Sequence, residues 1–300
     1  MKFLKGLALA VLGFLLFLSL SVFGLVLTLN QTILNPDFVA SQVDKLDIPS
    51  LAEDILSEEI PPEAEEFMGE IMTEVANDTV ADLEPWIKQQ VSASIYSFYD
   101  YLEGRSESLS LAISLEPVKE SFRDNLWKAV SESPPPELAG LSPAEIEQAL
   151  NEFWGEFSEQ IPSTFELDEA LLGPEVMAQL EQARQIVGYI HLTYNALIGL
   201  ILLLILGIVL INREVKGATR KIGITFLTCG IPWFVGIFIA KHFAGTQLTQ
   251  LEMPVYLQTW MPQFLNDLLA PLVMFSIGLL IAGVALLVVS FVYKRRQTEF

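Results

Sequence analysis

The sequence contains one cysteine, Cys229, and only two histidines, His191 and His242, among its 300 residues. A single cysteine excludes any disulfide within the chain, and Cys229 lies inside an apolar run. Neither histidine has a Cys or His partner at zinc-ligand spacing. A folded water-exposed domain in this chain must therefore be held together by its own apolar core rather than by disulfides or zinc.

Recognised catalytic motifs are also missing. The Gly-x-Ser-x-Gly and His-Glu-x-x-His patterns and the glycine-rich phosphate loops do not occur. Carboxylates are so numerous that no single pair stands out as an acid/base couple. We therefore expect no cofactor and interpret the chain as non-enzymatic; an enzyme would need a site of an unrecognised kind.

Basic residues are scarce in one region. Between residues 30 and 185 there are 33 Asp/Glu and 7 Lys/Arg, a net charge of −26, whereas the remainder has 4 and 10, a net charge of +6. Because 52% of all residues are hydrophobic, the acidic and apolar properties must be segregated. The acidic region repels nucleic acid and anionic lipid headgroups, so neither is expected as its direct partner.

Four long apolar runs are present, at about residues 6–29, 186–211, 222–240 and 268–293. About 20 apolar residues cross a bilayer as a helix, so each run predicts a span. The second is the end of a continuous helix predicted over residues 174–211, which starts polar. The first is longer than the apolar core of a signal peptide and lacks a good cleavage site, so a retained anchor is favoured over a cleaved signal.

The basic residues outside the acidic region predict the orientation. Nine of these ten lie at ends that would share the cytoplasmic side, and only Lys241 does not. We therefore predict a multi-pass protein of the cell membrane with both termini cytoplasmic and residues 30–185 outside. An outer domain without disulfides fits a prokaryotic envelope. The predicted organisation is an anchor (1–29), an acidic extracytoplasmic domain (30–185) and a three-helix transmembrane region (186–300).

Capping patterns divide the acidic region into helices. Helix starts are expected at Asn35, at Asp47, near Pro62, near Pro85, at Pro117 and at the Ser142–Glu145 capping box, with a stop at Gly104. Alternating apolar residues over 108–115 predict a half-buried strand. A second short strand is expected near 161–168, with Phe165 and Leu167 inward. The fold class is thus an α-helical membrane protein with four transmembrane helices and a mainly α outer domain carrying a short two-stranded ribbon.

One helix face carries the candidate functional residues. Arg184, Gly188, His191 and Asn195 follow one another at helical spacing where the predicted second span enters the membrane. Polar groups at that depth can form a vestibule or a proton-sensitive contact. The commoner alternative is an interfacial band, with Tyr189 and Tyr194, that hydrogen-bonds to neighbouring helices.

Two further groups of residues have a structural and a functional interpretation. The acidic clusters are expected to be solvated helix faces rather than calcium sites, because no loop with calcium-ligand spacing occurs. They comprise Glu58, Glu59, Glu63, Glu65, Glu66, Asp168 and Glu169. A short surface-lying helix is predicted over residues 254–264, whose aromatic face (Tyr256, Trp260 and Phe264) would anchor at the interface or dock a partner. A small-residue step at Gly278 and Ala282 permits close helix packing.

The chain resembles a family of uncharacterised four-span membrane proteins of bacteria and archaea. The resemblance is carried by Leu34-Asn-Pro-Asp-Phe-Val, by Tyr101-Leu-Glu-Gly-Arg-Ser-Glu-Ser-Leu-Ser-Leu-Ala-Ile-Ser-Leu-Glu-Pro-Val-Lys, and by the continuous helix that leads into three closing spans. It covers nearly the whole chain and implies a fold but no activity. Claudins and tetraspanins differ, because their outer cysteine motifs are missing here.

These observations lead to two main functional hypotheses. In the first, the outer domain binds a protein partner or senses the state of the envelope, and the lipid-embedded helices serve as anchor. In the second, the chain is a subunit of a transporter or channel, in which self-associated copies line a path with the His191 and Asn195 face.

Overall fold

The chain divides into two compact units in a computed structural model that describes residues 2–59, 68–135, 138, 140–212, 214–248 and 254–296. One unit comprises Met1–Val39, Ala183–Met253 and Leu257–Phe300, and we call it the four-helix unit. The other comprises Ala40–Gln182 and Pro254–Tyr256. We call it the acidic unit, because these residues include 32 Asp/Glu and 6 Lys/Arg.

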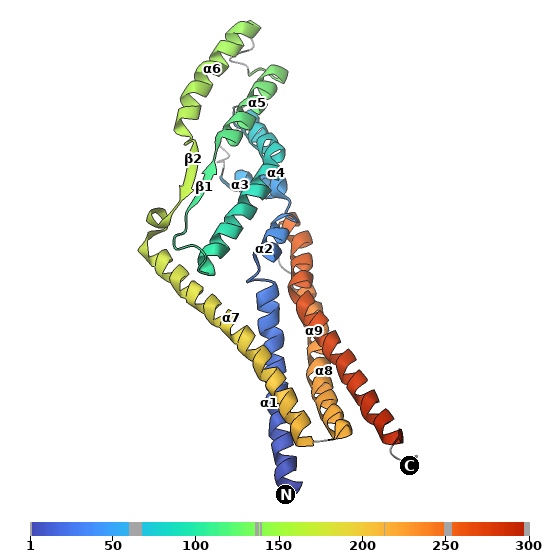
Figure 1. Ribbon diagram of the computed structural model, residues 1–300. Helices are drawn as coiled ribbons and strands as arrows, with labels where there is room; N and C mark the ends of the chain where they lie inside the picture. Colours follow the sequence, from blue (N-terminus) through green and yellow to red (C-terminus); the bar gives the residue numbers. More distant parts are fainter. Residues whose placement is uncertain are drawn as a thin grey trace. The chain divides into compact units, whose positions relative to one another are not determined.

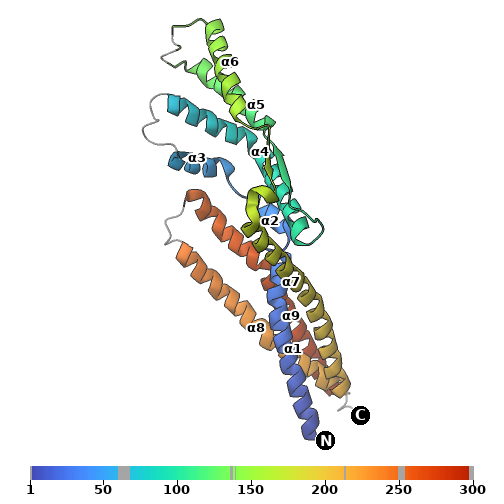
Figure 2. The ribbon, with the colours of Figure 1, turned by 90° about the vertical axis from the view of Figure 1, so that its left-hand side faces the viewer.

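The four-helix unit is built from four long helices (Figures 1 and 2). Each contains a stretch long and apolar enough to cross a membrane, and together they indicate an α-helical multi-pass membrane protein. The helices are α1 (Lys2–Gln31), α7 (Glu169–Asn212, whose first residues belong to the acidic unit), α8 (Val215–Leu248) and α9 (Val255–Arg296).

Helix α7 contains the predicted continuous helix. Gly173 has a positive φ of 76°, a conformation that glycine adopts without steric cost, and it separates the first turn from the helix that begins at Pro174. From Pro174 the helix runs without a break to Asn212. The predicted passage from polar to apolar sequence within one helix is therefore confirmed.

Two side-chain hydrogen bonds connect helix ends of the four-helix unit. Lys5 Nζ, near the start of α1, donates to the backbone oxygen of Asn212 at 3.2 Å. Ser290 Oγ, near the end of α9, donates to the backbone oxygen of Lys216 at 3.1 Å. The start of α1, the α7–α8 junction and the end of α9 consequently lie at the same end of this unit (Figures 1 and 2).

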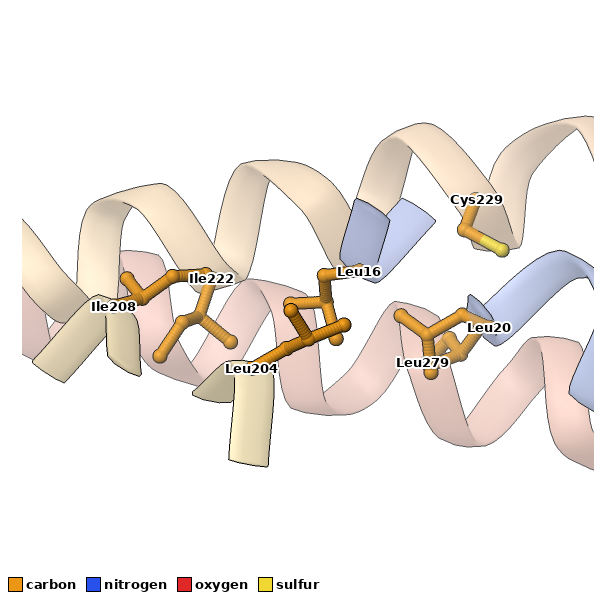
Figure 3. Close-up of a cluster of buried hydrophobic side chains, with 7 residues drawn as sticks. All are labelled: Leu16, Leu20, Leu204, Ile208, Ile222, Cys229 and Leu279. Atoms are coloured by element: carbon orange, nitrogen blue, oxygen red, sulfur yellow. The ribbon is translucent and has the colours of Figure 1, made fainter. Parts of the chain in front are cut away.

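The core of the four-helix unit is apolar and draws on all four helices (Figure 3). Leu16 of α1 and Ile208 of α7 are completely buried. Seven buried residues form the cluster: Leu16, Leu20, Leu204, Ile208, Ile222, Cys229 and Leu279. In α1, α7 and α8 they recur at steps of four or seven, which is the spacing of one helical face, and α9 contributes Leu279.

Two glycines allow the backbones of α8 and α9 to approach closely. A Cβ atom at Gly223 would lie 2.9 Å from the backbone oxygen of Gly283, and one at Gly283 would lie 3.0 Å from that of Gly223. Gly230 lies seven residues further on and faces the backbone oxygen of Ser276 in the same manner. The predicted small-residue step at Gly278 is not used for packing within the chain, since a Cβ at Gly278 would have nothing within 4 Å. The close approach uses Gly283 instead.

The predicted short surface-lying helix over residues 254–264 is wrong. Helix α9 is continuous from Val255 and contains both Pro262 and Pro271. A proline removes one backbone hydrogen bond, but packing on both sides can hold the helix together. Here the Trp260 ring stacks on Phe264 with centroids 4.9 Å apart, and Phe264 contacts Phe38 at 6.3 Å. The side chain of Tyr256, the third aromatic residue of that predicted face, lies outside the described residues.

Helices α8 and α9 extend beyond the apolar runs from which their spans were predicted. Helix α8 begins at Val215 rather than near residue 222 and extends to Leu248, and α9 begins well before residue 268. The basic residues Lys216, Arg220 and Lys221 therefore lie in the first turns of α8 and not in a loop. Lys and Arg are good helix formers, and their long side chains let a helix continue past the apolar boundary.

The acidic unit is mainly helical. Its helices are α2 (Pro36–Val43, which begins in the four-helix unit), α3 (Ile48–Glu59), α4 (Met68–Leu102), α5 (Glu116–Glu132) and α6 (Pro143–Gln160). The predicted caps at Asn35 and Asp47 are confirmed, because their carboxamide and carboxylate oxygens accept the backbone N–H groups of Asp37 and Ser50 at 2.9 and 3.2 Å. The capping box of α6 is also confirmed.

One predicted helix boundary in this unit is wrong. Pro85 does not begin a helix but lies inside α4, which runs unbroken to Leu102. The ion pair between Glu84 and Lys88, at 2.7 Å, bridges the turn that Pro85 weakens. Helix α4 also packs against both α3 and α5, so tertiary contacts offset the lost backbone hydrogen bond. Gly104, with φ of 76°, follows the helix end as predicted.

A two-stranded antiparallel ribbon joins β1 (Leu111–Ser114) and β2 (Thr164–Leu167). Leu111 pairs with Leu167, and Ile113 pairs with Phe165. The expectation that Phe165 points inward is wrong, since its side chain is 45% exposed. Leu167 lies two residues on, on the same face of the strand, and is half-buried, so a ribbon of only two strands covers this face incompletely.

The core of the acidic unit lies between α4, α5 and α6. Ile71 and Val75 of α4 pack with Leu126 and Val130 of α5 and with Leu150 of α6. Within α4 and within α5 these residues are four positions apart, as on one apolar face of a helix. The partly buried residues around them include Met72, Phe122 and Ile146.

Candidate functional site

The four residues of the predicted functional face of α7 differ in their exposure. Arg184 and His191 are half-buried, whereas Gly188 and Asn195 are exposed. The side of α7 that packs inward is marked by Val187, which is buried, and by Tyr194, whose ring stacks on Phe23 of α1 with centroids 5.5 Å apart. Arg184 and His191 therefore lie nearer the inward side of the helix than Gly188 and Asn195 do.

The Asn195 side chain bonds to its own helix. Its Nδ2 donates to the backbone oxygen of His191 at 3.2 Å, four residues earlier. Such a bond lowers the cost of placing an amide among apolar side chains. In this contact the Asn195 amide bonds within α7 and does not join α7 to another helix. A vestibule or proton-sensitive contact at Arg184, His191 and Asn195 stays a prediction.

An apolar cavity of about 540 Å³ opens within the four-helix unit, between α1, α8 and α9. Among the described residues that line it, the polar side chains are those of Ser21, Cys229 and Trp233. Ser21 Oγ donates to the backbone oxygen of Phe17 at 2.9 Å and lies 3.5 Å from Cys229 Sγ. The lining residues are Phe17, Ser21, Leu25, Cys229, Pro232, Trp233, Gly236, Ile237, Ala240, Leu269 and Leu272. Such a wall suits an alkyl chain and offers no charged group for catalysis.

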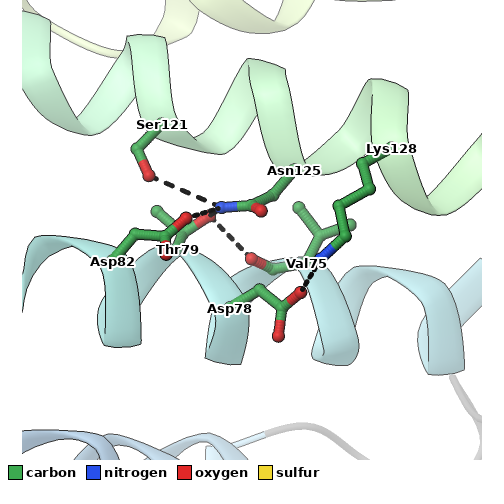
Figure 4. Close-up of polar contacts among 7 residues, drawn as sticks. All are labelled: Val75, Asp78, Thr79, Asp82, Ser121, Asn125 and Lys128. Carbon is green, nitrogen blue, oxygen red and sulfur yellow. Dashed lines mark hydrogen bonds and ion pairs between the residues drawn. The ribbon is translucent and has the colours of Figure 1, made fainter.

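A polar cluster in the acidic unit joins α4 to α5 (Figure 4). Asn125 is buried, and its Nδ2 donates to Asp82 Oδ2 at 3.0 Å and to Thr79 Oγ1 at 3.4 Å. The Thr79 hydroxyl donates in turn to the Val75 backbone oxygen at 2.6 Å. Near this cluster, Lys128 Nζ lies 3.2 Å from Asp78 Oδ2.

The groups of this cluster are suited to holding the two helices together rather than to acid–base catalysis. The hydrogen bond from Lys128 to Asp78 raises the pKa of that lysine, which keeps its ammonium group charged. The Asn125 amide is neutral and cannot act as an acid or base. Together the contacts fix the register of α5 against α4. Asn125 is not among the residues singled out from the sequence, although a polar residue beside apolar residues at helical spacing (Phe122, Leu126 and Val130) is a detectable signal.

The predicted acidic clusters show no cation site within the described part of the chain. Asp168 Oδ1 accepts the backbone N–H of Leu171 at 2.9 Å and so serves as a helix cap. Glu63, Glu65 and Glu66, and the side chains of Glu58 and Glu59, lie outside the described residues. Among the residues that are described, no three His, Cys, Asp or Glu side chains are grouped so that they could hold a metal ion.

A second apolar cavity, of about 320 Å³, lies in the acidic unit between α4, α5 and α6. All of its lining residues are apolar: Ile71, Met72, Leu126, Val130, Pro135, Leu138, Ala149, Leu150 and Phe153. The sequence pattern alone did not predict that these positions leave a hollow. Ala149 is a sequence signal for this hollow, because it is a small residue among the large apolar residues of α6.

Comparison of the chain with protein-family models, with curated proteins and with solved structures found no match.

Proposed function

We propose that the chain is a non-enzymatic protein of a prokaryotic cell membrane, with the acidic unit outside the cell and with a partner or an envelope-derived ligand as its target. One observation carries the orientation: the start of α1, the α7–α8 junction and the end of α9 meet at one end of the four-helix unit. Lys2, Lys5, Lys216, Arg220 and Lys221 belong to these segments. The positive-inside rule then assigns this end to the cytoplasm.

The position of the acidic unit follows from that orientation. Its main segment, Ala40–Gln182, is inserted between α1 and the apolar part of α7, both of which cross the membrane in this proposal. The chain leaves the cytoplasmic end along α1 and returns along α7, so the inserted segment faces the opposite side. Its net charge of −26 also makes contact with an anionic membrane surface unfavourable.

Binding is better supported than catalysis. The buried polar cluster at Asn125 holds two helices together, and the cavities of both units have apolar walls. An apolar cavity with few polar groups favours recognition of an apolar group over chemical attack on it.

Cross-linking in intact cells tests this function. A membrane-impermeant amine-reactive cross-linker reaches Lys45 and Lys128 of the acidic unit only if that unit is outside. We expect capture through a C-terminal tag to recover a partner whose cross-links map to these two lysines. Replacing both lysines with arginine should remove those cross-links while leaving the protein level unchanged. Cross-links that map only to Lys216 or Lys221 would contradict the proposal.

A transport role is the second candidate, and one observation favours it. Asn195 is exposed on a helix that is apolar enough to cross a membrane. A polar side chain facing lipid is costly, so a second copy of the chain would be expected to cover it. Ion flux into vesicles that contain the purified protein tests this role. Loss of flux in Asn195→Leu, but not in Thr193→Leu on a different side of α7, would favour transport.

A further inference from the structure

The α4–α5–α6 cavity of the acidic unit is large enough to receive side chains from outside. Its volume of about 320 Å³ is at the lower end of the usual range for ligand sites, about 300–1,000 Å³. That volume suits one or two apolar side chains rather than a large cofactor. The wall contributes no charged group and no side-chain hydrogen-bond donor, so the occupant must be apolar at this point.

Aromatic side chains lie next to the cavity. Phe153, which lines it, is 36% exposed, and its ring stacks on Phe157 with centroids 5.6 Å apart. Phe157 stacks in turn on Phe122 of α5 at 5.2 Å. The apolar surface therefore continues from the cavity along α6, as a groove that receives an amphipathic helix requires.

The surroundings of this surface are strongly acidic. Helix α6 contains five glutamates and no basic residue, and no Lys, Arg or His occurs anywhere from residue 129 to residue 183. Glu152 and Glu156 are exposed and follow Ala149 and Phe153 at steps of three, so they flank the cavity-lining face of the helix. None of the five glutamates forms an ion pair with a described residue.

We propose that the α4–α5–α6 cavity binds the apolar side chains of a cationic amphipathic peptide, whose Lys or Arg residues face Glu152 and Glu156. The peptide is a separate molecule or an exposed segment of a partner protein. Charge complementarity selects this occupant, because an acidic or neutral amphipathic peptide would fill the cavity without compensating the carboxylates. A second copy of the acidic unit is disfavoured by its own charge. The inference rests on the proposed binding function and names the class of partner.

Peptide binding to the full-length protein tests the proposal. The protein is placed in nanodiscs of neutral phosphatidylcholine, which do not attract cations. Fluorescence anisotropy is recorded with a labelled amphipathic helix of Leu and Lys, with its Leu/Glu counterpart, and with a scrambled Leu/Lys sequence. We expect the first peptide to bind at least tenfold more tightly than the other two, and the affinity to fall as salt is raised.

Two kinds of variant locate the site. Ala149→Phe fills the cavity and should weaken binding at least tenfold, whereas Ala144→Phe, at an exposed position of the same helix, should not. Ala149→Leu fills the cavity with a smaller side chain, and it takes the place of Ala149→Phe in the binding test if that variant does not fold. Glu152→Gln with Glu156→Gln should weaken binding several-fold. Glu147→Gln with Glu166→Gln changes the net charge equally and should have a much smaller effect.

Equal binding of the Leu/Lys and Leu/Glu peptides, or unchanged binding in both Ala149 variants, would overturn the proposal. That failure is distinguishable from failure of the proposed function. Cross-links to Lys45 and Lys128 in intact cells, together with absent peptide binding, would refute only the cationic amphipathic partner. Cavity-dependent peptide binding, together with cross-links that map only to Lys216 or Lys221, would refute the outer location and leave the site itself standing.

Discussion

The two units of this molecule satisfy their buried polar groups in different ways. In the four-helix unit, the hydroxyls of Thr28, Thr225 and Ser276 donate to backbone oxygens three or four residues earlier in the same helix. In the acidic unit, the Asn125 amide joins α5 to two side chains of α4. These three hydroxyls thus bond within their own helices, and the buried Ser290 hydroxyl bonds to a backbone oxygen of α8, whereas in the acidic unit a buried side-chain amide connects two helices through side chains.

The surrounding solvent explains this difference. Lipid is as apolar as a protein core, so burying leucine against leucine gives membrane helices little drive to associate, and close packing matters more. The Gly223–Gly283 contact supplies such packing. In water, apolar burial itself stabilises the acidic unit by about 25 cal/mol per Å². A polar network is then useful for register, because apolar contacts alone are not directional.

The largest effect is expected at the α8–α9 contact. Gly283→Leu places a side chain against the backbone of Gly223 and the side chain of Leu227, and we expect loss of the folded four-helix unit. Gly278→Leu, on the same helix with nothing within 4 Å, is the matched control. The fraction of protein that remains monodisperse in mild detergent measures both variants. A Gly283→Leu protein that behaves like the control would show that close backbone packing is not required.

A smaller loss is expected from the polar network of the acidic unit. Asn125→Ala removes the donor shared by Thr79 and Asp82 and should lower the free energy of unfolding by about 1–3 kcal/mol. Asn151→Ala, on the exposed side of α6, should change it by less than about 0.5 kcal/mol. Thermal unfolding of the full-length protein, followed by tryptophan fluorescence, compares them. Equal melting temperatures for the two variants would show that the hydrogen bonds of Asn125 do not stabilise the acidic unit.

A matched pair of threonine substitutions compares the two units directly. Thr79→Val deletes a hydroxyl that Asn125 uses, and we expect a cost of about 1–2 kcal/mol. Thr225→Val deletes a hydroxyl that bonds only to the Lys221 backbone oxygen among the described contacts, so its cost should be below about 0.5 kcal/mol. Thermal unfolding of both variants measures the difference. If Thr225→Val costs as much as Thr79→Val, the distinction between the units fails.

The smallest effect concerns the capping box of α6 and depends on pH. The Ser142 hydroxyl and backbone N–H donate to the Glu145 carboxylate and lower its pKa. Because the folded-state pKa lies below the unfolded one, the stabilising contribution is present above the ordinary Glu pKa of about 4.3 and is lost as pH falls through the lowered value. Glu145→Gln should therefore melt slightly below wild type at pH 7, and the gap should close at about pH 3.

The control for this prediction is Glu147→Gln on the same helix. It should show no gap that closes with acid, because no hydrogen bond to its carboxylate is present among the described residues. A constant difference between wild type and Glu145→Gln at both pH values would show that the carboxylate charge does not contribute.

The elements that sequence analysis predicted well are those fixed by local chemistry. Asn35, Asp47 and the Ser142–Glu145 pair mark helix starts through their own side chains, and apolar length alone identifies the four long helices. The failures at Pro85 and Pro262 have a common cause. Each proline weakens its helix locally, but the ion pair across Pro85 and the aromatic stack beside Pro262 come from residues a turn away and from tertiary contacts.

The candidate sites show the same limit. The periodicity of Arg184, His191 and Asn195 placed them on one helix, but only the packing of Val187 and Tyr194 shows which of them turn inward. The hollow beside Ala149 depends on how three helices that are distant in sequence meet. Residue spacing within one segment cannot predict such a void, because its size depends on how the side chains of α4, α5 and α6 pack together.

The central claim is that the acidic unit lies outside the cell, and cysteine labelling tests it most directly. Native Cys229 is buried and is replaced by alanine. Single cysteines are then introduced at Ser108 in the acidic unit and at Glu214 in the α7–α8 junction, both exposed positions. A membrane-impermeant maleimide applied to intact cells should label Ser108→Cys and should label Glu214→Cys only after permeabilisation. Labelling of Glu214→Cys but not Ser108→Cys in intact cells would contradict the account.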